Sequence, residues 1–159
     1  MNRIDKLKEE LELDPHPEGG WFRETYRCRK EVETSRGIKN AGTGIYFLLA
    51  GGELSQWHRV ASDEMWHFYE GDTLILEMIH PGGSTSQKRL GTSLALDEEP
   101  QVLVPGGSWQ RAWSSGGYTL VGCTVTPGFD FNDFEMMEPE RLAEEYPDLK
   151  EFILRDPFG

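Results

Sequence analysis

Short runs of apolar and β-branched residues, separated by glycine and proline at regular intervals, fill most of the chain. Such runs are typical of β-strands when turn-forming residues bound them. The pattern predicts nine strands, at residues 21–27, 44–50, 54–60, 64–71, 73–79, 87–91, 101–104, 108–114 and 118–126. Many short strands at this spacing indicate a β-sandwich or a closed barrel. Alternation is only partial within 73–79, so we expect some strands to be covered on both faces.

Helical spacing of apolar residues occurs only near the two ends of the chain. Residues 3–13 carry an apolar stripe among charged residues, which predicts a short amphipathic helix that Pro15 ends. Residues 138–153 combine a proline and acidic residues in a first turn with a second apolar stripe. We therefore expect two short helices on the outside of the β-structure. The polar stretch 30–43 predicts an exposed loop.

The length and charge of the chain limit its class and its partners. A chain of 159 residues fits a single domain, here 1–159, because no repeat or linker divides it. Acidic residues number 28 against 16 basic residues, which gives a net charge of −12. Such a field repels phosphate backbones and anionic membranes, so we expect neither nucleic acid nor membrane as a partner.

Cysteine usage and the absence of a secretory signal predict a cytoplasmic protein. Only Cys28 and Cys123 occur, without the spacing of a zinc motif or a disulfide framework. The neighbours of Cys123 are apolar, which favours a role in core packing. The longest apolar run, 45–50, is too short to cross a bilayer.

The stretch 57–72 has the composition of a functional site. It contains two histidines, two glutamates, two aspartates and four aromatic residues, groups that are costly to bury without partners. Because side chains two apart on a strand point the same way, Gln56 should share the face of His58. Glu64 begins the next strand and can face His58 across a barrel interior. His67 should point away from Glu64 unless a β-bulge intervenes.

A second polar position follows the turn at 104–107. Gln110 lies on the strand after this turn and is a candidate for the same interior wall. An amide donates and accepts hydrogen bonds but is a poor transition-metal ligand beside histidine or carboxylate.

The spacing of these residues resembles the two motifs of the cupin superfamily. The positions that match are His58, Glu64, Gly71, Pro105 and Gly107. Val60 replaces the second histidine of the first motif, and Gln110 replaces the histidine of the second. Half of the metal-binding shell of that superfamily is therefore missing.

The chain is most similar to the fifth cupin family, long labelled a domain of unknown function. The resemblance rests on several motifs in order, namely 16–20, 24–27, 45–49, 55–59, 63–67 and 127–129, and covers residues 11–134. It implies an all-β double-stranded β-helix, a jelly-roll barrel open at one end, with the short terminal helices outside it. It also implies homodimers, and it implies no established reaction.

Several functions remain open for such a barrel. The first is a small-molecule-binding protein whose pocket surrounds His58 and Glu64 and takes a small polar or sugar-like ligand. The further ligand-binding residues that we predict are Tyr46, Gln56, His67 and Gln110. The cluster could also serve only to hold the two sheets together.

The other two functions are enzymatic and use the same pair as catalytic residues. Nucleotide-sugar epimerases are cupins in which a histidine at the place of His58 removes a proton beside a carbonyl, and the pKa of imidazole suits that role. Glu64 could orient His58 but would repel a developing enolate. In a metal-dependent enzyme, His58 and Glu64 would be ligands to Mn, Fe, Ni or Zn, completed by His67, Gln110 or Gln56.

Overall fold

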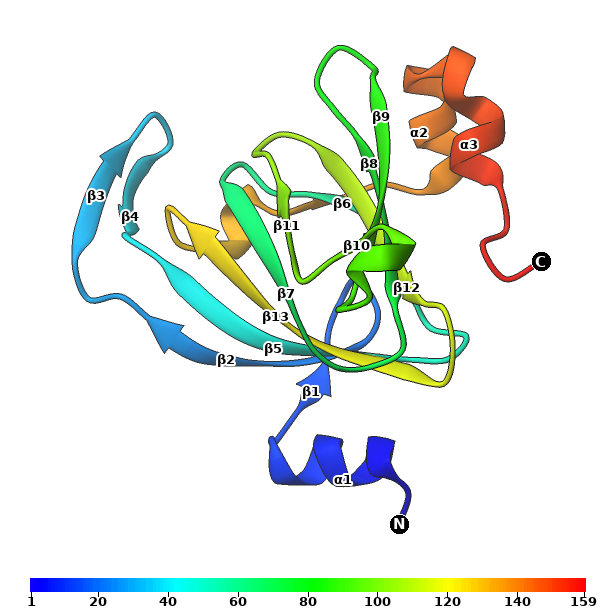
Figure 1. The fold of residues 1–159 in the computed structure, drawn as a ribbon. Coiled ribbons are helices and arrows are strands. Elements are labelled where there is room, and N and C mark those ends of the chain that lie inside the picture. The colour runs from blue at the N-terminus through cyan, green and yellow to red at the C-terminus, as the bar shows by residue number, and fades with distance from the viewer.

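Two six-stranded sheets lie face to face in the computed structural model, which describes residues 1–159 (Figure 1). The first sheet contains, in spatial order, β1 (Asp14–Pro15), β2 (Trp21–Arg27), β5 (Thr43–Ala50), β13 (Tyr118–Thr126), β7 (Asp63–Gly71) and β11 (Gln101–Val104). The second contains β10 (Glu98–Glu99), β9 (Thr85–Leu90), β8 (Leu74–Ile79), β12 (Trp109–Ser114), β6 (Leu54–Arg59) and β14 (Glu135–Met136). This arrangement confirms the predicted jelly roll.

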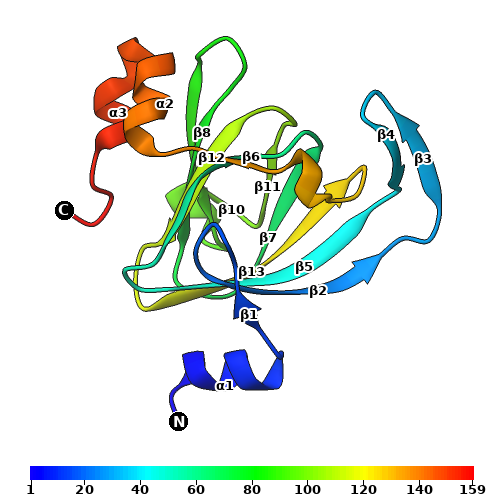
Figure 2. The same cartoon turned by 180° about the vertical axis from the view of Figure 1, so that it is seen from behind.

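Helices flank the sheets at both ends of the chain (Figure 2). The α-helices are α1 (Arg3–Glu10), α2 (Pro139–Glu145) and α3 (Lys150–Leu154), and the short 3₁₀ turns are η1 (Leu94–Leu96), η2 (Phe131–Asp133) and η3 (Pro147–Leu149). Asn2 caps the N-terminus of helix α1, because its side chain accepts a hydrogen bond from the Asp5 backbone N–H at 2.8 Å. None of the helices has the length and apolar character needed to cross a membrane.

The prediction of a loop at 30–43 is wrong, because most of this stretch forms a hairpin of β3 (Glu31–Thr34) and β4 (Gly37–Asn40). The turn suits a hairpin, since Gly37 has φ +100° and the Thr34 hydroxyl donates to its carbonyl at 2.6 Å. The hairpin extends beyond β2 and β5, away from the C-terminal helices (Figures 1 and 2). Its many polar residues reflect exposure, not irregular structure.

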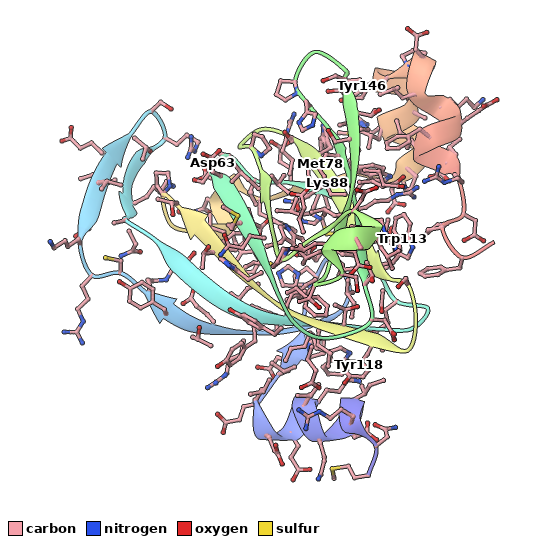
Figure 3. The ribbon with its side chains drawn as sticks, viewed as in Figure 1. Asp63, Met78, Lys88, Trp113, Tyr118 and Tyr146 are labelled. Atoms are coloured by element: carbon pink, nitrogen blue, oxygen red, sulfur yellow. The ribbon has the colours of Figure 1, made fainter.

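Strand β8 shows how the core is divided. Leu74, Leu76 and Met78 face the space between the sheets, and Figure 3 shows Met78 among the side chains there. Ile79 faces outward and packs in a second cluster with the C-terminal helices. Every residue of β8 is buried, so the expectation of strands covered on both faces is confirmed.

Candidate functional site

A cavity opens between the two sheets at the end of the barrel near the β3–β4 hairpin. It measures about 60 Å³, room for several water molecules or a small organic group, since one water needs roughly 10–15 Å³. The lining is His16, Glu18, Phe22, Glu24, Arg27, Thr43, Ile45, His58, Val60, Glu64, Cys123, Val125, Phe129, Phe131 and Phe134. Apolar walls thus surround a small group of ionisable side chains.

The turn before β2 delivers two of these ionisable side chains. Gly19 has φ +104°, and a Cβ atom there would lie 2.3 Å from the carbonyl oxygen of Leu54. Only glycine lets the turn press so closely on β6. The Gln56 N–H donates to the Glu18 carbonyl at 2.7 Å, and the His16 N–H donates to the Gly20 carbonyl at 2.9 Å. The turn therefore holds the side chains of His16 and Glu18 in the cavity.

A β-bulge in β6 turns Ser55 and His58 toward the Glu18 side chain. His58 pairs with Gln110 and Ser55 with Ala112, so two residues of β6 stand opposite Arg111 alone. As a result Ser55 and His58, three residues apart, both face the interior. The Ser55 hydroxyl donates to Glu18 Oε2, and His58 Nε2 lies 3.1 Å from the same oxygen.

The Glu18–His58 pair is buried and holds a proton between its members. His58 Nδ1 lies 2.7 Å from the Gln56 carbonyl oxygen, which can only accept, so Nδ1 carries a hydrogen. Burial raises the pKa of Glu18 to about 8, and burial lowers the pKa of His58. At neutral pH the Glu18 carboxyl is therefore protonated and faces the unprotonated Nε2 of a neutral His58.

His16 is neutral as well, and its hydrogen lies on the opposite nitrogen. Its Nδ1 accepts the Glu18 backbone N–H at 3.1 Å, which leaves the hydrogen on Nε2. Burial lowers the pKa of His16 to about 4, and the neighbouring His58 adds to this shift. The ring packs edge-on against Phe22, with centroids 4.5 Å apart.

Glu64 enters the cavity from the first residues of β7. Gln110 Nε2 donates to Glu64 Oε1 at 2.7 Å, and Gln110 Oε1 in turn accepts from Trp66 Nε1 at 3.0 Å. This chain of bonds fixes both the amide and the carboxyl group. Burial raises the pKa of Glu64 to about 7, although His58 opposes the shift.

Two polar atoms of the cavity have no nitrogen or oxygen partner in the protein. Neither His16 Nε2 nor Glu64 Oε2 is paired with a nitrogen or oxygen of the protein, and the Cys123 thiol is the remaining hydrogen-bonding neighbour of the Glu64 carboxyl. The buried side-chain atoms that lack a partner are Arg23 Nε and Trp109 Nε1. His16 Nε2 and Glu64 Oε2 are not among these fully buried atoms. Both atoms therefore face open space in the cavity, where a ligand can reach them.

An aromatic segment, which we call the phenylalanine strap (residues 128–134), borders the cavity. Phe129, Phe131 and Phe134 pack on one another with centroids 4.8 to 5.9 Å apart. Lys39 of the hairpin reaches the two aspartates of the strap, with Nζ 2.8 Å from Asp130 and 3.1 Å from Asp133. The hairpin therefore holds the strap in place over the ionisable group.

Of the residues predicted from the sequence, His58 and Glu64 line the cavity. Gln110 lies behind Glu64 and supports it without lining the cavity. His58 and Glu64 form no ion pair, since no nitrogen–oxygen pair between them falls within 4 Å. Glu18, rather than Glu64, is the acidic partner of His58.

Three predicted ligand-binding residues lie outside the cavity and are corrected here. Gln56 falls in the bulge, so its side chain borders a surface groove beside α2 instead of sharing the face of His58. His67 points outward, because no bulge separates it from Glu64, and its Nε2 lies 2.9 Å from Thr124 Oγ1. Tyr46 packs on the outer side against Tyr69, with centroids 6.4 Å apart.

The donor set does not fit the metal centre that the resemblance suggested. Val60 offers no donor, both ends of the Gln110 amide are engaged, and His58 Nε2 lies 3.1 Å from Glu18 Oε2. No group of three or more His, Cys, Asp or Glu side chains is arranged to hold a metal ion. The donor atoms that no other nitrogen or oxygen engages are His16 Nε2 and Glu64 Oε2, so Mn, Fe, Ni or Zn would find two ligands, fewer than a stable site requires.

The sequence pattern did not predict that Glu18, Ser55 and His16 belong to the site. None of them shows strand periodicity with His58, because a turn and a bulge position them. The signal that could have found them is the Gly19–Gly20 pair, since adjacent glycines after a histidine and a glutamate indicate a close backbone approach.

Comparisons to known proteins agree with the fold. Residues 5–137 match the family described as Cupin superfamily (DUF985). The chain belongs to this family. Among solved structures, this cupin is similar to a hypothetical protein from Leishmania major, with 33% identity, 96% and 97% of the two chains covered and a TM-score of 0.90. Protein SO0799 from Shewanella oneidensis is 41% identical, with 96% of each chain covered and a TM-score of 0.88.

Two further proteins are similar to this chain at lower sequence identity. The uncharacterised protein YML079W of Saccharomyces cerevisiae is 24% identical, over 86% of this chain and 76% of its own. An oxalate decarboxylase from Bacillus subtilis is 16% identical with a TM-score of 0.59, over 91% of this chain and 36% of its own. At that identity the likeness shows the cupin fold alone.

Proposed function

We propose that this cupin binds a small, uncharged organic molecule in the barrel cavity. The apolar body of the ligand packs against the phenylalanine strap and the valine and isoleucine walls. Its polar head accepts a hydrogen bond from His16 Nε2 and donates one to Glu64 Oε2. The observation that carries this proposal is that a largely apolar cavity contains two polar atoms, His16 Nε2 and Glu64 Oε2, that no nitrogen or oxygen of the protein pairs with.

The charge of the cavity favours a neutral ligand. A ligand carboxylate would add a like charge beside Glu64, at a site where burial already raises the pKa of Glu64 to about 7. An amine could pair with Glu64 and with the aromatic rings, but it would leave the His16 N–H without an acceptor. A head group with both an acceptor and a donor, such as an amide or a hydroxycarbonyl, satisfies both atoms.

The contacts of His58 favour binding over the epimerase mechanism in which His58 is the base. One ring nitrogen donates to a backbone carbonyl, and the other lies 3.1 Å from Glu18 Oε2. A general base must instead reach the proton that it removes from the substrate. In this cupin His58 serves as a support for Glu18.

A matched series of probes tests the proposal. Isobutyramide, isobutyrate and isobutylamine share one body and differ in the charge of the head group. We expect NMR titration at neutral pH to show the tightest binding for the amide. Val60→Phe, which fills the cavity, should abolish it, whereas the same change at Val32, on the hairpin outside the cavity, should not.

The proposal fails if isobutyramide binds no better than the two charged probes. It also fails if Val60→Phe and Val32→Phe retain binding equally, since the probe would then occupy another place on the molecule.

A further inference from the structure

We propose that the cavity catalyses proton transfer beside the carbonyl of a small α-hydroxycarbonyl compound, with Glu64 Oε2 as the base and His16 Nε2–H as the donor to the carbonyl oxygen. This inference rests on the proposed function and adds a reaction and a substrate class to it. Both residues line one cavity, neither atom is paired with a nitrogen or oxygen of the protein, and the Cys123 thiol is the remaining neighbour of the Glu64 carboxyl. In this proposal the two atoms are a donor and an acceptor for the same hydroxycarbonyl group.

His16 is suited to stabilise the oxygen on which negative charge develops. The Glu18 backbone N–H, 3.1 Å from Nδ1, fixes the hydrogen of the ring on Nε2. Burial lowers the pKa of His16 to about 4, so the ring stays neutral while it donates. A neutral imidazole N–H can polarise a carbonyl and remain a donor to the enediolate that forms.

Glu64 is suited to remove a proton from carbon. Gln110 holds Oε1 at 2.7 Å, and Trp66 holds Gln110, so the free oxygen has a fixed direction. Burial raises the pKa of Glu64 to about 7. A base with a pKa near the working pH combines a useful ionised fraction with a strong affinity for the proton.

The reaction needs no oxidant, metal or second substrate. Glu64 Oε2 takes the proton from the carbon that carries the hydroxyl group, and the electrons of that C–H bond form the carbon–carbon double bond. The carbonyl π electrons move to oxygen, which accepts a hydrogen bond from His16. Glu64 then returns the proton, either to the same carbon or, after a proton moves between the two enediol oxygens, to its neighbour.

Glu18 and His58 are positioning residues in this reaction. Glu18 fixes the His16 ring through its backbone N–H, while its side chain is fixed by Ser55 and lies 3.1 Å from His58. Burial raises the pKa of Glu18, so its carboxyl stays protonated. No second negative charge then lies near the enediolate.

Hydroxyacetone in heavy water provides the test. We expect the wild-type protein to accelerate exchange of its CH₂OH protons for deuterium above the buffer rate, measured by ¹H NMR. Glu64→Gln should lower the enzymatic rate about 100-fold or more, the usual contribution of a general base. His16→Ala should lower it by a similar factor. The control is Glu99→Gln, a surface change that should leave exchange at the wild-type rate.

Two further measurements separate the possible failures. Glu64→Asp keeps a carboxylate and should retain measurable exchange, and the wild-type rate should rise with pH through the pKa of Glu64 near 7. Binding of hydroxyacetone is followed separately by NMR titration. If hydroxyacetone binds but exchanges only at the buffer rate, or exchanges equally in Glu64→Gln, the reaction is refuted and the proposed binding function stands. If hydroxyacetone does not bind, the substrate class is refuted, and the isobutyramide series decides the binding function.

Discussion

Replacing Glu18 by glutamine should make the stability of the fold less dependent on pH. In the folded state burial raises the pKa of Glu18 from 4.5 to about 8, so the carboxyl stays protonated while the unfolded chain ionises. The unfolded state then binds fewer protons, and the free energy of unfolding falls as pH rises between these two values. Stability from this group is thus complete below pH 4.5 and is lost on the way to pH 8.

The size of the effect follows from the same shift. Each pH unit within the window changes the free energy of unfolding by about 1.4 kcal/mol, so the range from pH 5 to pH 8 corresponds to about 4 kcal/mol. A glutamine amide mimics the protonated carboxyl, because its NH₂ group can donate to His58 Nε2 and the Ser55 hydroxyl can turn to accept. We therefore expect Glu18→Gln to gain stability relative to the wild type as pH rises.

Urea unfolding at four pH values between 5 and 8 measures this difference. Subtracting the two curves removes the contributions of His16, His58 and Glu64 as long as those groups keep their environment. Glu99→Gln, an exposed change, should give a curve parallel to that of the wild type. If the difference between Glu18→Gln and the wild type is the same at pH 5 and pH 8, Glu18 is not held protonated in the fold and the assignment of the shared proton is refuted.

Three other experiments test separate features of the fold and the cavity. Gly19→Ala should destabilise the fold by about 2 kcal/mol or more beyond Gly37→Ala in urea unfolding, because both sites have positive φ but only Gly19 meets a backbone carbonyl at 2.3 Å. In the native protein a thiol reagent should modify Cys28, whose pKa a neighbouring tyrosine hydroxyl lowers, and spare Cys123, whose pKa burial raises; two equally reactive thiols would contradict this. Lys39→Met removes the ion pairs to the phenylalanine strap and should raise the dissociation constant of isobutyramide about 5-fold in NMR titration, corresponding to roughly 1 kcal/mol. An unchanged constant would mean that the strap holds its position without the hairpin.

The strand pattern was enough to predict the barrel and the inward direction of two site residues. His58 and Glu64 lie on neighbouring runs, and their place in the cavity follows from strand direction and closure of the barrel. The outward direction of His67 also follows from alternation, once no bulge is present. These features depend only on the period of two residues along a strand, which a sequence displays openly.

The rest of the site depends on local irregularities that leave little trace in the hydrophobic pattern. Simple alternation predicts that Gln56 faces the interior together with His58. The bulge of β6 adds one residue between them and so reverses the alternation, and Ser55 faces the interior instead. Glu18 reaches the cavity from a turn, where neighbouring residues have no fixed direction. Its contact with His58 joins residues 40 positions apart and becomes visible only in the folded chain.

The two departures from the cupin motifs and the N-terminal turn have a common physical effect. Val60 and Gln110 stand at the two histidine positions of the motifs, so the cavity lacks the donors that would stabilise a bound cation and keep nearby carboxyl groups ionised. Burial raises the pKa of both Glu18 and Glu64. Glu18 and Glu64 take up protons near neutral pH, while His16 and His58 stay neutral. The cavity therefore has a low net charge and carboxyl groups that can exchange protons with a ligand. Such a cavity is suited to a neutral ligand and to proton transfer.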